Sequence, residues 1–378
     1  MRIDKYTFYF FIALGIFSSF LIFWYFPLSF SDSIYTKYQD PLFMDQNFYV
    51  YHARRLCHVE NLTIEDFNVT WSSFGVMSYL TYACKLTSYP MGYIFFNIIF
   101  FILSLSIFIK SLTVALKKDS LNFSFITALL IPVSIYYVSL PGKEIFSYCG
   151  AFVFCSGIIY LKSKKFLKGA SYILISIIVV SVSRPHEGFA LFLLTMIFLT
   201  NIKITIFRFL FYGAIFSFIF EALILLLVNT FFNTEFVSII DMLGFKSELD
   251  QYLSNENIII HFILGPIRVI VICLGTLLTS ILPLFDILKF DISFYLYKSV
   301  PLFLRFIEMF AAITAFIILL KNTHPNTKII LTIFLYYIFF VTFFGIEQRT
   351  RYLFAVFPIL IIYCDQIIYL HNKKSNQE

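Results

Sequence analysis

Long runs of apolar residues dominate this sequence and decide which solvent most of the chain can face. Runs of about 20 residues that are almost free of charge recur along the chain, and this is the length an α-helix needs to cross the hydrocarbon core of a bilayer. Of the 378 residues, 60% are hydrophobic and only 13% are charged, whereas soluble proteins carry about 25% charged residues. Too few charges remain to cover a water-facing surface. We therefore expect the bilayer to be the solvent for most of the chain.

These runs predict an all-α, polytopic integral membrane helical bundle with about ten transmembrane helices. We find no internal repeat and no soluble domain, so residues 1–378 are interpreted as a single transmembrane domain. Two long outer loops remain, at 28–90 and 230–303. Each contains an apolar stretch, 73–90 or 258–283, that we interpret as interfacial or re-entrant because prolines and charges interrupt it. The predicted spans are 7–27, 91–116, 121–140, 145–161, 169–183, 188–201, 209–229, 304–320, 327–345 and 352–370.

Basic residues cluster between the predicted spans, and every cluster follows an even number of spans. All clusters therefore lie on the same side of the membrane, and we call this agreement their common parity. Because Lys and Arg accumulate in cytoplasmic loops, this pattern places both termini in the cytoplasm. The net charge of +6 follows from these loops, and we expect no nucleic-acid partner. The clusters are Arg2 with Lys5, Lys117 with Lys118, Lys162 to Lys168, Lys203 with Arg208, Lys321 with Lys328, and Lys373 with Lys374.

The six cysteines are scattered along the chain without the spacing of a metal site. Cys57 and Cys84 both fall in the first outer loop, which the parity argument places away from the cytoplasm. Disulfides persist in oxidising compartments. A Cys57–Cys84 disulfide is therefore one of the arrangements that the sequence allows.

Charged residues on the outer side gather at the breaks between apolar runs. The runs 169–183 and 188–201 are shorter than a full span, so the break between them should lie below the membrane surface. Ionisable groups at that depth are costly and normally face a watered cavity or a partner. Pro185 can begin a helix, whose free N–H groups suit phosphate, and Arg184 offers a bidentate fork for phosphate oxygens. The break at 141–144 has the same form.

A pocket with arginines, a helix N-terminus and carboxylates suits a sugar linked to a lipid phosphate or pyrophosphate. The arginines would stabilise charge on the leaving group, and a carboxylate would take the proton of the acceptor hydroxyl. Each of these residues could instead simply anchor a helix end, and that interpretation stays open. The candidate catalytic residues are Asp45, Asp40, Glu144, Glu187 and His186. The candidate substrate-binding residues are Lys143, Arg184, Arg349, Arg351, His52, Arg54 and Arg268.

Three short segments carry a resemblance to known families. Residues 44–54, which begin Met-Asp-Gln-Asn-Phe-Tyr, look like the aspartate-then-tyrosine loop after the first span of GT-C glycosyltransferases. The Pro-Gly-Lys-Glu of 141–144, followed by Arg-Pro-His at 184–186, resembles a pattern in bacterial polysaccharide polymerases of the O-antigen polymerase (Wzy) type. The Gln-Arg-Thr-Arg-Tyr-Leu of 348–353 is similar to the start of the last span in both groups.

The GT-C resemblance implies a catalytic base in the first outer loop, for which Asp45 is the best match and Asp40 the second. The polymerase resemblance implies outer arginines that grip lipid pyrophosphate without a metal, a role for Arg184 with Arg349 or Arg351. The second outer loop departs from the better-known polymerases, because it contains a single arginine, at position 268. Both resemblances imply a multi-pass protein of a bacterial inner membrane.

We therefore expect an O-antigen or exopolysaccharide polymerase that joins undecaprenyl-pyrophosphate-linked oligosaccharide repeat units on the periplasmic face of the inner membrane. A GT-C glycosyltransferase that uses a polyprenyl-phosphate-linked sugar is the first alternative, and a transporter or flippase of polysaccharide precursors is the second. No cofactor is expected, except that Asp40 and Asp45 could bind a divalent cation under the GT-C interpretation. The expected partners are the polyprenyl-linked substrate and the bilayer, and a chain-length regulator protein could join them.

Overall fold

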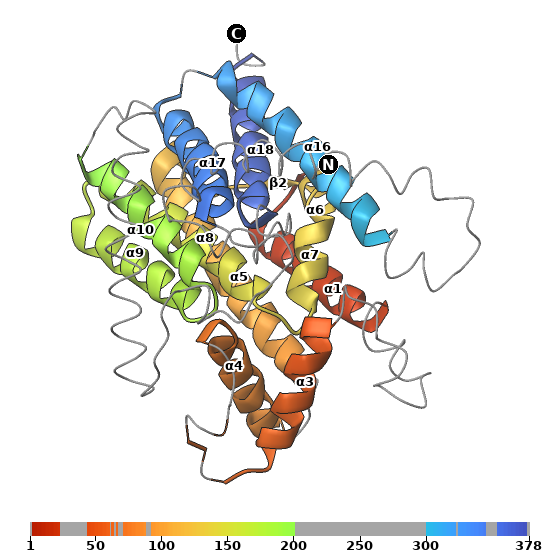
Figure 1. Ribbon diagram of the computed structural model, residues 1–378. Coiled ribbons are helices and arrows are strands. Elements are labelled where there is room, and N and C mark those ends of the chain that lie inside the picture. Colours follow the sequence, from red (N-terminus) through yellow and green to blue (C-terminus); the bar gives the residue numbers. More distant parts are fainter. Residues whose placement is uncertain are drawn as a thin grey trace.

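The structure is a computed structural model that describes residues 2–22, 44–60, 62, 63, 66, 71–87, 92–200, 300–322, 324–344 and 354–375. The regular structure in these residues is helical apart from one two-stranded antiparallel sheet, in which β1 (Arg2–Ile3) pairs with β2 (Phe123–Ser124). Figure 1 shows the helices gathered in a bundle, with α3 and α4 at one end. The helices are α1 (Lys5–Phe20), α3 (Met44–Cys57), α4 (Trp71–Thr87), α5 (Tyr93–Leu116), α6 (Phe125–Leu129), α7 (Pro132–Ser139), α8 (Glu144–Lys162), α9 (Phe166–Ser181), α10 (Pro185–Thr200), α16 (Val300–Leu320), α17 (Pro325–Phe344) and α18 (Phe357–Ser375).

Four helices in the described part of the chain are long and apolar enough to cross a membrane. They are α5, α8, residues 303–320 of α16, and a segment, 354–372, that contains most of α18. Shorter apolar helices lie in α1, α9, α10 and α17. All eight coincide with predicted spans, so helices are confirmed at these places, whereas the predicted count of ten spans is not. The predicted span 209–229 and most of the predicted loop 230–303 lie outside the described residues.

Contacts between neighbouring helices show which helix ends lie together. α5 and α8 run parallel, since the Phe101 ring contacts the Tyr148 ring and, further along both helices, the Phe108 ring contacts the Phe152 ring. The C-terminal ends of α5 and α8, each followed by lysines in the sequence, therefore lie at the same end of the bundle.

Two further contacts bring other basic segments to this end. The Asn326 side-chain amide at the start of α17 donates to the Ala115 carbonyl near the end of α5 over 2.8 Å. Arg2, just before α1, forms an ion pair with Asp365 of α18 over 3.1 Å, next to the segment that follows α5. The basic residues before α1, after α5, after α8 and around the α16–α17 turn thus share one end of the bundle, which we call the basic end. This grouping agrees with the common parity predicted from the sequence.

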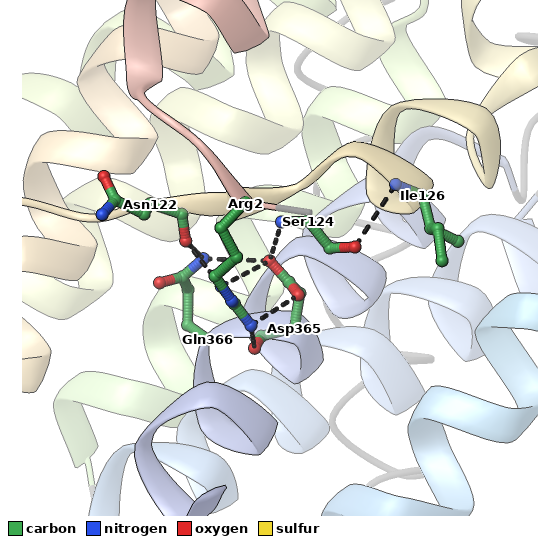
Figure 2. Close-up of polar contacts among 6 residues, drawn as sticks. All are labelled: Arg2, Asn122, Ser124, Ile126, Asp365 and Gln366. Carbon is green, nitrogen blue, oxygen red and sulfur yellow. Dashed lines mark hydrogen bonds and ion pairs between the residues drawn. The ribbon is translucent and has the colours of Figure 1, made fainter. Parts of the chain in front are cut away.

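A polar clamp closes the basic end (Figure 2). The Arg2 guanidinium donates to both carboxylate oxygens of Asp365, over 3.1 and 3.4 Å, and to the Asn122 carbonyl over 2.7 Å. The same carboxylate accepts the Ser124 N–H over 3.0 Å and a hydrogen of the Gln366 amide over 3.1 Å. The clamp therefore ties β1, β2 and α18 together.

The opposite end of the bundle holds α3 and α4, which a disulfide between Cys57 and Cys84 joins. This confirms the pairing that the sequence allowed. The Tyr79 hydroxyl of α4 donates to the Asn97 side-chain oxygen near the start of α5 over 2.5 Å. The starts of α5 and α8 therefore face the α3–α4 pair, and we call this side of the bundle the disulfide end.

The predicted span 121–140 is not one continuous helix. α6 ends at Leu129 and α7 begins at Pro132. Proline is the cause, because it fixes its own φ, lacks a backbone donor and disfavours helical backbone in the residue before it. The first turn of α7 faces Glu308 of α16, whose Oε2 accepts the Ser134 N–H over 2.9 Å. A carboxylate from a neighbouring helix therefore caps α7 inside the bundle.

Glycines set the spacing between α8 and α9, which run antiparallel. A Cβ at Gly157 would stand 2.9 Å from the Gly169 carbonyl oxygen, and a Cβ at Gly150 would clash with the Val180 side chain. Small residues at such contacts let membrane helices approach closely. The end of α9 is therefore held beside the start of α8, at the disulfide end.

Candidate functional site

Three buried charged side chains meet at the disulfide end, where α8 begins and α9 gives way to α10. The Arg184 guanidinium donates to the Glu144 carboxylate through Nη2 over 3.0 Å and to the Glu187 carboxylate through Nη1 over 2.6 Å. None of the three side chains is more than 3% exposed. The Tyr337 hydroxyl of α17 donates to the second Glu187 oxygen over 3.0 Å. We call these four residues the acid–base cluster.

The helix ends favour every charge in the acid–base cluster. Glu144 is the first residue of α8 and Glu187 lies in the first turn of α10, where the positive end of the helix dipole stabilises a carboxylate. Arg184 follows the last turn of α9, and the negative end of that helix stabilises a cation. The two helix breaks that the sequence analysis singled out thus bring opposite charges into contact.

The acid–base cluster contains one cation and two carboxylates, and both arms of the Arg184 fork are taken by carboxylates. In this conformation Arg184 does not present its fork to a phosphate. Phosphate binding by Arg184 therefore stays a prediction. What the structure does show is that Arg184 holds Glu144 and Glu187 together at the ends of three helices.

α3 brings further predicted residues to the start of α8. The Lys143 ammonium lies 5.7 Å from the centroid of the Tyr49 ring, and this contact joins α3 to the residue before Glu144. Asp45 lies one helical turn before Tyr49, so its backbone is on the face of α3 that meets Lys143. The side chain of Asp45 lies outside the described residues.

His52 and Arg54 lie further along α3. His52 is half-buried, and burial together with the nearby charge of Arg55 lowers the pKa of its imidazole, which is therefore neutral at pH 7. Arg54 is exposed in the last turn of α3. Neither residue belongs to the buried acid–base cluster.

The structure does not place the other predicted residues. His186 is in the first turn of α10, but its side chain lies outside the described residues. Four more positions lie outside them altogether, namely Asp40, Arg268, Arg349 and Arg351.

Sequence reasoning missed Arg305, Glu308 and Tyr337. Glu308 is completely buried, and the Arg305 guanidinium donates to the hydroxyl of Tyr137 on α7. Both charges lie in the apolar run 304–320, which its length predicts to be a span. An ionisable residue inside a span is itself a reason to expect a partner or a function, so this signal was present in the sequence. Nothing comparable pointed to Tyr337, because tyrosine is common throughout the chain.

An apolar cavity of about 400 Å³ lies beside the acid–base cluster. Ile145 and Phe146, which directly follow Glu144, form part of its wall, and the cavity extends along α8 to Val153. Residues of α4, α5 and α9 complete the lining, and the surface that they present is apolar. The cavity therefore suits a hydrocarbon chain whose polar head lies near the start of α8.

Among the described residues, no group of three or more His, Cys, Asp or Glu side chains could hold a metal ion. Comparisons with family models, with curated proteins and with solved structures found no match for this chain. The function proposed below therefore rests on the residues and their geometry.

Proposed function

We propose that this chain is a membrane-embedded glycosyltransferase of the polysaccharide polymerase type. It joins repeat units linked to polyprenyl pyrophosphate at the outer face of a bacterial inner membrane. The observation that carries the proposal is the position of the acid–base cluster, buried in an apolar bundle at the disulfide end. Ionisable side chains inside a membrane bundle are rare and costly, and they mark substrate or ion pathways.

Two features support placing this end away from the cytoplasm. A disulfide such as Cys57–Cys84 persists in oxidising compartments, and it lies at the same end as the acid–base cluster. Lysines and arginines gather at the opposite end, as they do on the cytoplasmic side of membrane proteins. A sugar-transfer reaction at the disulfide end would then use donors that have already crossed the membrane.

The apolar cavity supports a donor with a lipid tail. A polyprenyl chain in this cavity would place its pyrophosphate near the start of α8, where Lys143 stands. In the proposal, Lys143 binds a phosphate together with Arg349 and Arg351, and Asp45 takes the proton of the acceptor hydroxyl. Glu144 and Glu187 keep Arg184 charged and fixed beside them, and the excluded water limits competing hydrolysis.

A chain-growth assay tests the proposal. The purified full chain is placed in liposomes with a synthetic polyprenyl-pyrophosphate oligosaccharide, and the glycans released by mild acid are sized. We expect products two or more repeat units long, and we expect Asp45→Asn to lower their rate of formation at least 100-fold, because general-base catalysis contributes roughly 10²- to 10⁴-fold. Asp119→Asn is the matched control, since Asp119 is exposed just after α5, at the basic end.

The polymerase proposal would be refuted if the wild-type protein bound the donor but extended none of the repeat units tested. Equal activity of Asp45→Asn and Asp119→Asn would refute the role of Asp45 as base and leave chain growth to other carboxylates.

Two observations favour other functions. The backbone of Asp45 lies on the α3 face that meets Lys143, which suits a GT-C transferase with its base in the first outer loop. Such an enzyme would add one sugar from a polyprenyl monophosphate donor and would not lengthen a repeat. The break between α6 and α7, with buried Glu308 at the break, suits a transporter, because discontinuous helices line transporter sites. A transporter would move labelled lipid-linked glycan across the liposome membrane without changing its length.

A further inference from the structure

Arg305 is a charged residue of the bundle that the proposed function does not use. Of the ion pairs in the described part of the chain, one belongs to Arg2 and the others to Arg184. Arg54 and Arg55 are exposed on α3. Arg305 differs from all four, because it is the third residue of the apolar stretch of α16 and pairs with no carboxylate among the described residues. A guanidinium in such a place is costly until an anion compensates its charge.

The acid closest to Arg305 along α16 does not compensate it. Glu308 lies one turn further on, but its carboxylate is turned to α7. There the Ser134 N–H donates to Oε2 over 2.9 Å, and the Ser134 hydroxyl donates to Oε1. The carboxylate therefore serves the helix cap, at a distance from the Arg305 guanidinium beyond that of an ion pair.

The Arg305 side chain is folded inward against α7. Its guanidinium carbon lies 5.4 Å from the centroid of the Tyr137 ring, and the guanidinium also donates to the Tyr137 hydroxyl. The Nε atom is buried and has no hydrogen-bond acceptor among the described residues. An arginine that merely anchors a helix end extends its whole head group to the water, whereas the half-buried Arg305 side chain holds its guanidinium against the Tyr137 ring.

Arg305 lies at the disulfide end of the bundle. α16 reaches the basic end at Leu320, about 22 Å along the helix from Arg305 at 1.5 Å per residue. Tyr137 lies in the last turn of α7, where the Ser139 carbonyl accepts the hydroxyl of Tyr93 at the start of α5 over 3.3 Å. The guanidinium therefore stands near the end of α16 on the disulfide side of the bundle, which the proposed function places at the outer face.

We propose that Arg305 and Tyr137 form a binding site for a lipid phosphate, and that the ligand is the polyprenyl phosphate group of the substrate. The guanidinium fork matches two phosphate oxygens, and the Tyr137 hydroxyl donates a further hydrogen bond. The identity of the lipid rests on the proposed function, whereas the anion site itself rests on Arg305, which has no carboxylate partner in the described part of the chain.

Lipid binding to the intact chain tests the site. The full chain is reconstituted in phosphatidylcholine nanodiscs and titrated with a short-chain polyprenyl phosphate, and the Kd is measured by native mass spectrometry. We expect Arg305→Gln to raise the Kd about 10- to 100-fold, because a hydrogen-bonded charge is lost. Arg305→Lys should raise it less, and Tyr137→Phe should raise it a few-fold. Arg55→Gln, at an exposed arginine of α3, is the matched control and should leave the Kd unchanged.

Competing ligands identify the source of the phosphate. If phosphatidylglycerol binds as tightly as the polyprenyl phosphate and depends equally on Arg305, the anion site stands and the polyprenyl assignment is overturned. If polyprenyl phosphate binds through Arg305 while the chain-growth assay yields no product, the site stands and the polymerase proposal fails. If Arg305→Gln does not fold, Arg305→Lys and Tyr137→Phe decide. A wild-type Kd in every variant that folds would overturn the site.

Discussion

Replacing Arg184 should destabilise the bundle strongly, and the structure gives the size of the effect. Arg184 makes two ion pairs, over 3.0 and 2.6 Å, with carboxylates that are almost fully buried. Removing one partner of a buried pair costs about 3–5 kcal/mol, because an uncompensated charge stays buried. Arg184→Met leaves two such carboxylates next to each other. We therefore expect the upper end of this range, about 5 kcal/mol, which lowers the folding equilibrium constant more than 10³-fold.

The comparison with neutralised partners separates electrostatics from packing. If charge is the cause, combining Arg184→Met with Glu144→Gln and Glu187→Gln should recover most of the loss, since replacing a buried ionic group entirely is often nearly neutral. Arg54→Met is the control for losing an exposed arginine and should stay within about 0.5 kcal/mol of wild type.

Reversible unfolding in mixed micelles, with increasing sodium dodecyl sulfate and intrinsic fluorescence as the signal, measures these free energies. The reasoning fails if Arg184→Met is no less stable than Arg54→Met. It also fails if the triple variant is as unstable as Arg184→Met alone, because the loss would then come from packing rather than from unpaired charge.

Four further predictions concern other parts of the fold. Gly157→Ala should lower the free energy of unfolding by about 1–3 kcal/mol, because the new Cβ meets the Gly169 backbone. Gly15→Ala would meet only the side chain of Ile135, so it should cost less than about 1 kcal/mol in the same unfolding assay. Glu308→Ala should cost about 2–4 kcal/mol by leaving two Ser134 donors unsatisfied, and Glu308→Gln should cost less; equal losses would contradict the capping role. Cys84→Ser should make Cys57 reactive toward alkylation under non-reducing denaturing conditions, where wild-type Cys57 should stay unlabelled in mass spectra. The pKa of His52 is lower in the folded chain than in the unfolded chain, so the unfolded chain binds the proton at a higher pH. The stability contribution of neutral His52 should therefore be lost as the pH falls below about 6.5. The free energy of unfolding of His52→Gln should change less between pH 7.5 and 5.5 than that of wild type.

Much of the architecture follows from physical regularities visible in the sequence. Apolar runs predict the four helices long enough to cross a membrane and the four shorter apolar helices that the structure describes. In hydrocarbon the backbone N–H and C=O groups must bond to each other, and a helix satisfies them within one segment. The parity of the basic clusters predicts that the ends near Lys117 and Lys162 lie together, and the contacts between α5 and α8 bear this out. Pro132 could have predicted the break between α6 and α7, since proline inside an apolar run interrupts a helix. The length of the apolar run 121–140 by itself predicts one continuous span, so length and proline give opposite predictions here.

The partners of the charged residues could be predicted only in part. The α8–α9 hairpin brings Glu144 and Arg184 to the same end, and this follows from the similar lengths of the two helices. The ion pair between Arg184 and Glu144 does not follow, because it depends on the close approach that the small residues between α8 and α9 allow. The hydrogen bond from Tyr337 joins residues 150 positions apart. Such a contact depends on how α17 packs against α10, for which the sequence pattern has no signal.

The contact between Arg2 and Asp365 has a consequence for assembly. The two residues are 363 positions apart, so nearly all the intervening helices must be synthesised and inserted before the contact can form. Until then the guanidinium lacks the carboxylate that neutralises it, and β1 has β2 but not α18 to rest on. Formation of the Arg2–Asp365 contact is therefore a late step of biogenesis. Protection of the segment around Ile3 from protease would report that α18 has been inserted and has reached β1.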